Sequence, residues 1–305
     1  MRILIAGGSG FIGRAAAIDL AAAGHEVVVL SRDPERARPR LAPGLGAERW
    51  DARTAAGWGR LLDRPAAILN LAGENIAARR WTPRQKRALR ESRLDAARAV
   101  VEAVRQAELR PAVVLQASGI GYYGSCGEDE VSEDHLPGAD FLAELSIAWE
   151  AASAEVEELG VRRVVLRTGM VLAREGGALA KMLPAFRFGL GGPLGGGRQW
   201  WPWIHLADEV GAIRFLLERR GAEARGPYNL TAPQPLRNRD FARALGRALH
   251  RPALLPAPAF ALRLALGEMA EALLRGQRAL PSRLLDAGYA FQHPRLDGAL
   301  ADLLG

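Results

Sequence analysis

Residues 3–13 read Ile3-Leu4-Ile5-Ala6-Gly7-Gly8-Ser9-Gly10-Phe11-Ile12-Gly13, an apolar run followed by a glycine-rich stretch. An alanine-rich segment with helical character comes next, so the order is strand, glycine turn and helix, which is typical of a dinucleotide-binding loop. Gly7 permits the tight turn, Gly10 lets phosphates approach the backbone, and Gly13 lets the helix pack closely on the strand. The amides at the start of the helix and the positive end of its dipole then face the anion. We therefore expect this loop to bind a dinucleotide cofactor through Gly7, Ser9, Gly10, Phe11, Ile12 and Gly13.

The next apolar strand, residues 26–30, ends in Ser31-Arg32, and this ending bears on the choice of cofactor. An acidic residue here favours NAD because it accepts a hydrogen bond from the ribose 2′-hydroxyl, whereas arginine accommodates a 2′-phosphate. A hydroxyl and a guanidinium together can bind that phosphate. Asp33 is expected to cap the short turn that follows. The pattern predicts NADP(H) rather than NAD, and a merely solvated Arg32 is the alternative.

Length and composition limit the class of protein. With 305 residues, of which 49% are hydrophobic, the chain suits two domains or one large α/β unit with an appendage. Its one cysteine, Cys126, excludes a disulfide framework and fits a reducing compartment. The chain enters a strand directly, with no signal peptide and no run of eighteen apolar residues. We expect a cytoplasmic protein without a membrane partner.

The net charge of +7 raises the question of nucleic-acid binding. The arginines are spread along the chain, with no dense basic tract and few interleaved aromatic residues. This distribution indicates a compositional bias toward alanine and arginine, and no nucleic-acid partner is predicted.

Short apolar strands alternate with helical patterns over the first two-thirds of the chain, which predicts a doubly wound, Rossmann-type parallel sheet in an α/β fold. Thr82 and Pro83 are the expected cap and first residue of the long helix. Strands are predicted at 2–6, 26–30, 46–50, 66–70, 112–117 and 161–167, and helices at 11–23, 57–62, 83–107 and 139–159.

After Arg167 this alternation changes. A helix near 177–188 leads into the glycine-rich residues 189–197 and then into Trp200, Trp201 and Trp203. Either these residues form a mobile loop beside an aromatic-lined pocket, or the tryptophans fill core in an irregular connection. A helix at 207–219, a strand at 226–230 and a mainly helical terminal segment follow. We expect a dinucleotide-binding domain at 1–232, with 170–203 contributing to a substrate lobe, and a smaller, mainly helical C-terminal domain at 233–305.

The assembled motifs resemble the extended short-chain dehydrogenase/reductase superfamily, and within it an epimerase-like branch with a C-terminal domain of unknown function. The superfamily resemblance rests on the 7–13 loop, Asp51 after the third strand, Asn70-Leu71-Ala72-Gly73 after the fourth and Ala117-Ser118 after the fifth. The resemblance to the branch rests on 118–124, Phe141-Leu142-Ala143-Glu144 with Trp149-Glu150, Leu166-Arg167-Thr168-Gly169, 191–195, Trp203-Ile204-His205, 229–233, Leu280-Pro281 and 287–291.

This resemblance implies a role for each strand end. The three glycines of the loop would hold the pyrophosphate, Ser31 and Arg32 the 2′-phosphate, and Asp51 the adenine. The ribose and nicotinamide side would be lined by Leu71, Ala72 and Gly73. Independently, the carboxyl ends of parallel strands are where open α/β sheets bind ligands.

The chain departs from the superfamily in its proton-transfer residues. The usual chemistry needs a tyrosine with a lysine four residues later on one helix face, where the lysine lowers the tyrosine pKa. The residues four places after the chain's four tyrosines are Cys126, Gly127, Ala232 and His293, and on the expected helix the register offers Phe141 with Leu145 or Leu142 with Ser146. The pair is therefore absent.

Other residues are left as catalytic candidates. Ser118 fits the hydroxyl that polarises a carbonyl, and either Tyr122 or Tyr123 is a substitute acid, with loop packing as the alternative for both tyrosines. Glu144 is a further candidate. His205 is also one, although a structural role before a helix capped by Asp208 is favoured. The histidines show no metal-ligand spacing, so no metal is expected.

We expect an NADP(H)-dependent oxidoreductase or epimerase acting on an unidentified small polar substrate. The alternative is a non-catalytic NADP(H)-binding protein with a regulatory or partner-binding role, which the missing tyrosine–lysine pair favours. The oligomeric state is left open.

Overall fold

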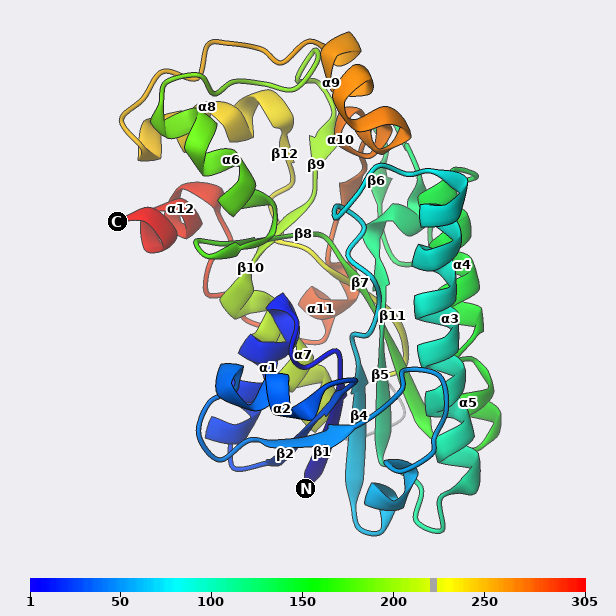
Figure 1. Ribbon diagram of the computed structural model, residues 1–305. Helices are drawn as coiled ribbons and strands as arrows, with labels where there is room; N and C mark the ends of the chain where they lie inside the picture. Colours follow the sequence, from blue (N-terminus) through cyan, green and yellow to red (C-terminus); the bar gives the residue numbers. More distant parts are fainter. Residues whose placement is uncertain (220–223) are drawn as a thin grey trace.

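A seven-stranded parallel sheet forms the centre of the computed structural model, which describes residues 1–219 and 224–305 (Figure 1). Its strand order is β11-β7-β5-β4-β1-β2-β3, and every neighbouring pair is parallel. The order reverses between β1 and β4, which places a crevice at the carboxyl ends of these strands. The predicted Rossmann-type α/β fold is confirmed. The strands are β1 (Arg2–Ala6), β2 (Glu26–Ser31), β3 (Gly46–Arg49), β4 (Ala66–Asn70), β5 (Val113–Gly119), β7 (Arg162–Thr168) and β11 (Gly226–Leu230).

Helices cover both faces of the sheet (Figure 1). On one face, α1 (Phe11–Ala22) packs against α7 (Leu206–Glu218), and their apolar sides share a core with the strands. On the other face lie α3 (Pro83–Gln106), α4 (Phe141–Ala151) and the short α5 (Glu155–Glu158), while α2 (Pro34–Ala37) follows β2. Because both faces are covered, the central strands β1 and β4 are buried at every position.

Two predicted helices differ in the structure. The helix expected at 139–159 breaks after Ala151, where the Ser153 hydroxyl donates to the Glu150 carbonyl and competes with the helical hydrogen bonds. The helix expected at 57–62 is a short 3-10 turn, η2 (Gly59–Leu62). The cap of the long helix is as predicted, because the Thr82 side chain accepts from the Gln85 amide.

The remaining elements form a lobe above the carboxyl edge of the sheet (Figure 1). Its core contains Trp201 and Trp203, so for these two residues the core interpretation is the correct one. Among the described residues, none of the helices combines the length and hydropathy that a membrane span requires. The lobe contains β8 (Met170–Ala173), α6 (Gly177–Arg187), β9 (Trp200–Trp201), β10 (Trp203–His205), β12 (Leu236–Arg237), α8 (Asn238–Ala248), α9 (Ala259–Leu266), η4 (Gly267–Ala270), α10 (Glu271–Leu274), β13 (Arg278–Ala279), which pairs with β6 (Glu130–Val131), α11 (Ser282–Asp286) and α12 (Leu296–Leu304).

The lobe reaches across to the helices beside the crevice. Met269 packs against an apolar cluster formed by α3, α4 and Trp81. Lys86 on α3 forms an ion pair with Glu268, and Lys181 on α6 donates to the Ala77 carbonyl in the segment after β4. These contacts hold the lobe against the edge of the sheet that carries the predicted site.

A carboxyl group is buried beneath this edge. Glu209, in the first turn of α7, is fully buried; one of its oxygens accepts from the Thr168 hydroxyl at 2.9 Å and the other has no partner among the described residues. Complete burial raises the pKa of Glu209 to about 8, although the Thr168 hydrogen bond opposes this shift.

This buried acid predicts a pH-dependent stability. The folded chain keeps the proton up to about pH 8, whereas the unfolded chain loses it near the ordinary glutamate value of 4.5, so rising pH between these values favours unfolding. The free energy of unfolding of the wild type should therefore fall relative to Glu209→Gln across this window, as measured by urea denaturation at several pH values. The control is Glu91→Gln, at an exposed position on α3, which should run parallel to the wild type. A constant difference between wild type and Glu209→Gln would contradict the assignment.

Candidate cofactor and active site

The glycine loop is shaped by close backbone contacts. Gly7 has a φ of 78°, and a Cβ there would lie 2.7 Å from the Leu71 carbonyl oxygen. A Cβ on Gly13 would lie 2.3 Å from the Gly7 oxygen, so the helix can approach the turn only with glycine at this position. Gly10 is exposed and caps α1 without a side-chain hydrogen bond. The first amides of α1, which lack intrahelical partners, are therefore suited to binding an anion.

The other three loop residues differ in their surroundings. Ser9 is exposed, whereas Phe11 and Ile12 are half-buried. The Phe11 ring packs on the turn between β8 and α6, where a Cβ at Gly176 would lie 2.5 Å from it. Its side chain therefore links the loop to the lobe.

The predicted 2′-phosphate residues lie at the carboxyl end of β2. Arg32 is exposed and forms no ion pair with any residue that the structure describes. The Ser31 hydroxyl accepts from the Asp33 amide at 3.2 Å, and the Asp33 carboxylate caps α2 as expected. Arg49, which the sequence analysis missed, pairs in register with Ser31 and donates to the Arg32 carbonyl at 3.4 Å. The Arg49 guanidinium therefore lies beside the Arg32 backbone, a juxtaposition that requires the β2–β3 register.

Asp51 lies two residues beyond the end of β3. Its carboxylate accepts from the Arg53 amide at 2.8 Å and from the amide and hydroxyl of Thr54 at 2.9 Å each. Burial alone would raise the pKa of Asp51, but these hydrogen bonds outweigh it and lower the pKa. The carboxylate therefore stays ionised and orders its own turn.

The segment after β4 continues the same edge of the sheet. The Leu71 amide donates to the Ala6 carbonyl at 2.9 Å, and the Ala72 amide to the Asn70 side chain at 3.2 Å. Gly73 is exposed. Leu71, Ala72 and Gly73 thus follow directly beside the glycine loop, in the row that the parallel strands create.

A buried ion pair holds the ends of β5 and β7 to α4. The Arg167 guanidinium donates to both carboxylate oxygens of Glu150, at 2.9 and 3.0 Å, and the Ser118 hydroxyl donates to the same carboxylate at 2.6 Å. Burial would lower the pKa of Arg167, but the hydrogen bonds and charge of Glu150 outweigh burial and raise it. Ser118 therefore already uses its only proton within the protein.

The two candidate tyrosines have different environments. Tyr123 is 2% exposed; its hydroxyl donates to Asn229 at 2.8 Å and accepts from Arg167 at 2.9 Å. Burial raises the pKa of Tyr123 to about 12 despite the nearby arginine. Tyr122 is half-buried, its ring lies 3.5 Å from the Arg167 guanidinium, and its hydroxyl makes no hydrogen bond to the residues described. Only the Tyr122 hydroxyl is uncommitted.

In the sequence analysis, Glu150 and Arg167 appear only as parts of the motifs that carry the family resemblance. Their pairing was not predicted. A charged residue at the end of the apolar run Val164-Val165-Leu166 was an available signal, because a buried arginine needs a partner. The partner itself could not be read from the chain. Glu144, on the first turn of α4, is exposed and takes no part in this network.

His205 has a structural role, as was favoured, but Asp208 is not the cap of α7 that the sequence predicted. His205 caps α7 itself, with Nδ1 accepting from the Ala207 amide at 3.1 Å, whereas Asp208 is buried and accepts from the amides of Gln292 and His293. His205, His293 and Asp302 lie close enough together to ligate a metal ion. Because Nδ1 of His205 accepts, its neutral ring carries the proton on Nε2, the atom that faces Asp302 at 3.2 Å.

Comparison with known proteins identifies the family. The model of the NAD-dependent epimerase/dehydratase family matches residues 3–231, and the model of a domain of unknown function matches 257–303. The chain belongs to the NAD-dependent epimerase/dehydratase family.

Relatives of this family member match it along its whole length. An epimerase family protein of Mycobacterium bovis is 41% identical over 300 residues, which cover 98% of this chain and 96% of the relative. The epimerase family protein SDR39U1 of Mus musculus is 40% identical over 308 residues, with complete coverage of both chains. A crystal structure of human SDR39U1 with NADPH superposes with a TM-score of 0.87 at 36% identity, covering 100% of this chain and 99% of that one.

In this epimerase/dehydratase family member, we expect the loss of the Arg167–Glu150 ion pair to lower the free energy of unfolding strongly. Arg167→Met leaves the Glu150 carboxylate buried without its partner and should cost about 3–5 kcal/mol of unfolding free energy, measured by urea denaturation. The control, Arg105→Ala, removes an exposed ion pair with Glu155 and should cost less than about 1 kcal/mol. Equal losses in the two variants would show that the buried pair does not organise this site.

Proposed function

We propose that the protein is an NADP(H)-dependent oxidoreductase or epimerase acting on a small polar substrate. The observation that carries this proposal is the glycine loop, in which Gly7 and Gly13 bring the uncapped start of α1 against the strand ends. The likeness to human SDR39U1, whose crystal structure contains NADPH, supports the same cofactor here. A bound NADP(H) would donate or accept hydride at C4 of its nicotinamide.

The preference for a 2′-phosphate is assigned to Ser31, Arg32 and Arg49. Arg32 is exposed and without an acidic partner among the described residues, and Arg49 lies beside it. No carboxylate ends β2, where one would repel the phosphate. Two guanidinium groups at one strand edge are suited to a dianion.

Arg32→Ala should weaken NADP(H) binding by about tenfold to a hundredfold and leave NAD(H) binding nearly unchanged, because only the former carries the 2′-phosphate. Isothermal titration calorimetry with both cofactors measures the difference. Arg38→Ala, an exposed arginine paired with Glu35, is the matched control and should alter neither affinity. Equal losses for the two cofactors would refute the 2′-phosphate assignment.

Within the site we assign the acid/base role to Tyr122. Its hydroxyl is uncommitted, and Arg167 places a positive charge against the ring that would carry negative charge as the proton moves. Ser118 can polarise a substrate carbonyl only by giving up its 2.6 Å hydrogen bond to Glu150. The Tyr123 hydroxyl donates its proton to a hydrogen bond with Asn229 and accepts one from Arg167, so its role is to position Arg167.

One observation favours the second candidate function, a cofactor-binding protein without turnover. At the helix positions where the superfamily's tyrosine–lysine pair is expected, Phe141 packs on Trp81 at a ring-centroid distance of 5.1 Å and Leu145 is buried. This face of α4 is therefore apolar. The Ser118 hydroxyl already donates its proton to Glu150, which also favours the non-catalytic function. Such a protein would use NADP(H) to stabilise a partner-binding conformation.

Nicotinamide fluorescence separates the two functions. The purified protein, loaded with NADPH or NADP⁺, is offered a panel of small carbonyl compounds, alcohols and sugars. Oxidation or reduction of the bound cofactor by any of them supports the enzyme. Tight cofactor binding without any conversion supports the non-catalytic protein, and a failure to bind either cofactor refutes both.

With a converting compound in hand, Tyr122→Phe should lower the rate of hydride transfer by about a hundredfold or more. Tyr123→Phe removes the same atom from the neighbouring residue and should mainly lower stability, because its hydroxyl joins Arg167 to Asn229. Single-turnover fluorescence and thermal unfolding measure the two effects. An unchanged rate in Tyr122→Phe would assign the proton to another group.

A further inference from the structure

Two loops of the C-terminal lobe run side by side along its outer edge (Figure 1). The Leu255 amide donates to the Gly191 carbonyl, and the Gly195 amide donates to the Ala257 carbonyl at 2.8 Å. The paired loops expose four large apolar side chains: Phe188 (81%), Leu190 (63%), Leu254 (80%) and Leu255 (53%). We call these four residues the apolar ridge. Large apolar side chains exposed to this degree on paired loops indicate an interaction surface.

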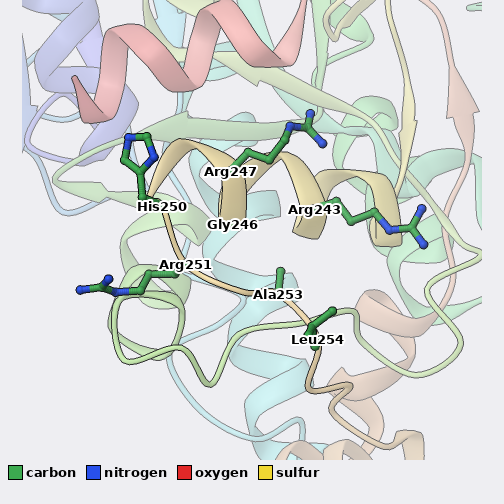
Figure 2. A pocket seen from close by; sticks show the side chains of 7 residues that line it. All are labelled: Arg243, Gly246, Arg247, His250, Arg251, Ala253 and Leu254. Carbon is green, nitrogen blue, oxygen red and sulfur yellow. The ribbon is translucent and has the colours of Figure 1, made fainter.

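A basic depression borders the ridge. It is lined by Arg243, Arg247, His250 and Arg251, and Leu254 of the ridge forms part of its rim (Figure 2). Arg251 also donates to the carbonyl of Arg187, the residue that precedes the ridge. Arg243 and Arg247 pair with exposed aspartates, whereas Arg187 and Arg251 have no acidic partner in the described part of the chain. Cationic side chains therefore flank the apolar ones.

The directions of these side chains restrict the occupant. Figure 2 shows that Arg243, Arg247 and Arg251 point away from one another, so they do not converge on a single small anion. Many separate anionic groups spread over a surface would satisfy such an arrangement. A second copy of the chain would bring like charges together. The apolar side chains stand out from loops, which suits insertion into an apolar layer.

We propose that the apolar ridge and the flanking arginines attach the protein to the surface of an anionic phospholipid bilayer. The apolar side chains enter the boundary between headgroups and acyl chains, while the arginines face the anionic headgroups. This proposal is independent of the enzymatic function. It revises the expectation of no membrane partner, which rested on the absence of a long apolar run and so concerned spanning helices alone.

Vesicle co-sedimentation tests the proposal. The full chain should pellet with phosphatidylcholine vesicles that contain phosphatidylserine, should not pellet with phosphatidylcholine alone, and should be released by high salt. The double variant Phe188→Ser/Leu254→Ser should lower the partition coefficient by at least about tenfold, and Arg251→Glu should lower it in the same direction. The controls are Leu136→Ser, at a position 79% exposed outside the lobe, and Arg98→Glu on α3, and both should bind like the wild type.

Thermal unfolding of each variant checks that it is folded. Failure of the wild type to pellet with anionic vesicles would overturn the proposal, as would equal binding by the folded ridge variant. Equal binding to neutral vesicles would refute the role of the arginines. Analytical ultracentrifugation of the wild type and the variants tests the alternative that a second copy of the chain occupies this surface. A dimer that the ridge substitutions dissociate would identify the surface as a contact between copies and would refute binding to the bilayer.

Discussion

The site depends on the close approach of the first helix to the turn that precedes it. A Cβ on Gly13 would lie 2.3 Å from the Gly7 carbonyl oxygen, and one on Gly7 would lie 2.7 Å from that of Leu71. Glycine at these positions lets β1, β4 and α1 meet in one place, because any side chain would force them apart. The uncapped amides of α1 then lie at the reversal of strand order, where an α/β sheet binds its ligand.

Around this scaffold, charge is organised differently from a tyrosine–lysine site. The positive charge belongs to Arg167, which is held by both oxygens of Glu150 and lies against the ring of Tyr122. The guanidinium also donates to the Tyr123 hydroxyl at 2.9 Å and to the Glu133 carbonyl at 3.0 Å, so four hydrogen bonds, two of them to Glu150, fix its position. A buried cation of this kind costs desolvation energy, which the carboxylate offsets. The same ion pair fixes the Tyr123 hydroxyl by a hydrogen bond, whereas it contacts only the ring of Tyr122 and leaves that hydroxyl available.

The C-terminal segment, matched by a domain of unknown function, completes this network from behind. The Leu280 carbonyl accepts from the Asn229 side chain at 2.9 Å, and the Arg283 amide donates to the buried carboxylate of Glu133 at 3.2 Å. The Asn229 side-chain oxygen in turn accepts a hydrogen bond from the Tyr123 hydroxyl. The segment also contacts α3 through Glu268 and Met269. It therefore supports both sides of the crevice while its outer edge remains exposed.

Local features of the sequence were enough for the sheet, the glycine turn and the cap at Thr82, because apolar runs, glycines and capping residues act over a few neighbouring positions. The strands and the main helices α1 and α3 lie within a few residues of their predicted bounds. The pairing of Arg167 with Glu150, the separation of Tyr122 from Tyr123 and the position of Arg49 beside Arg32 were decided by the tertiary structure. Each of these depends on contacts between different elements, such as the hydrogen bond between Tyr123 and Asn229, which are 106 positions apart in the sequence. Their contact depends on strand order and register, which no local pattern specifies.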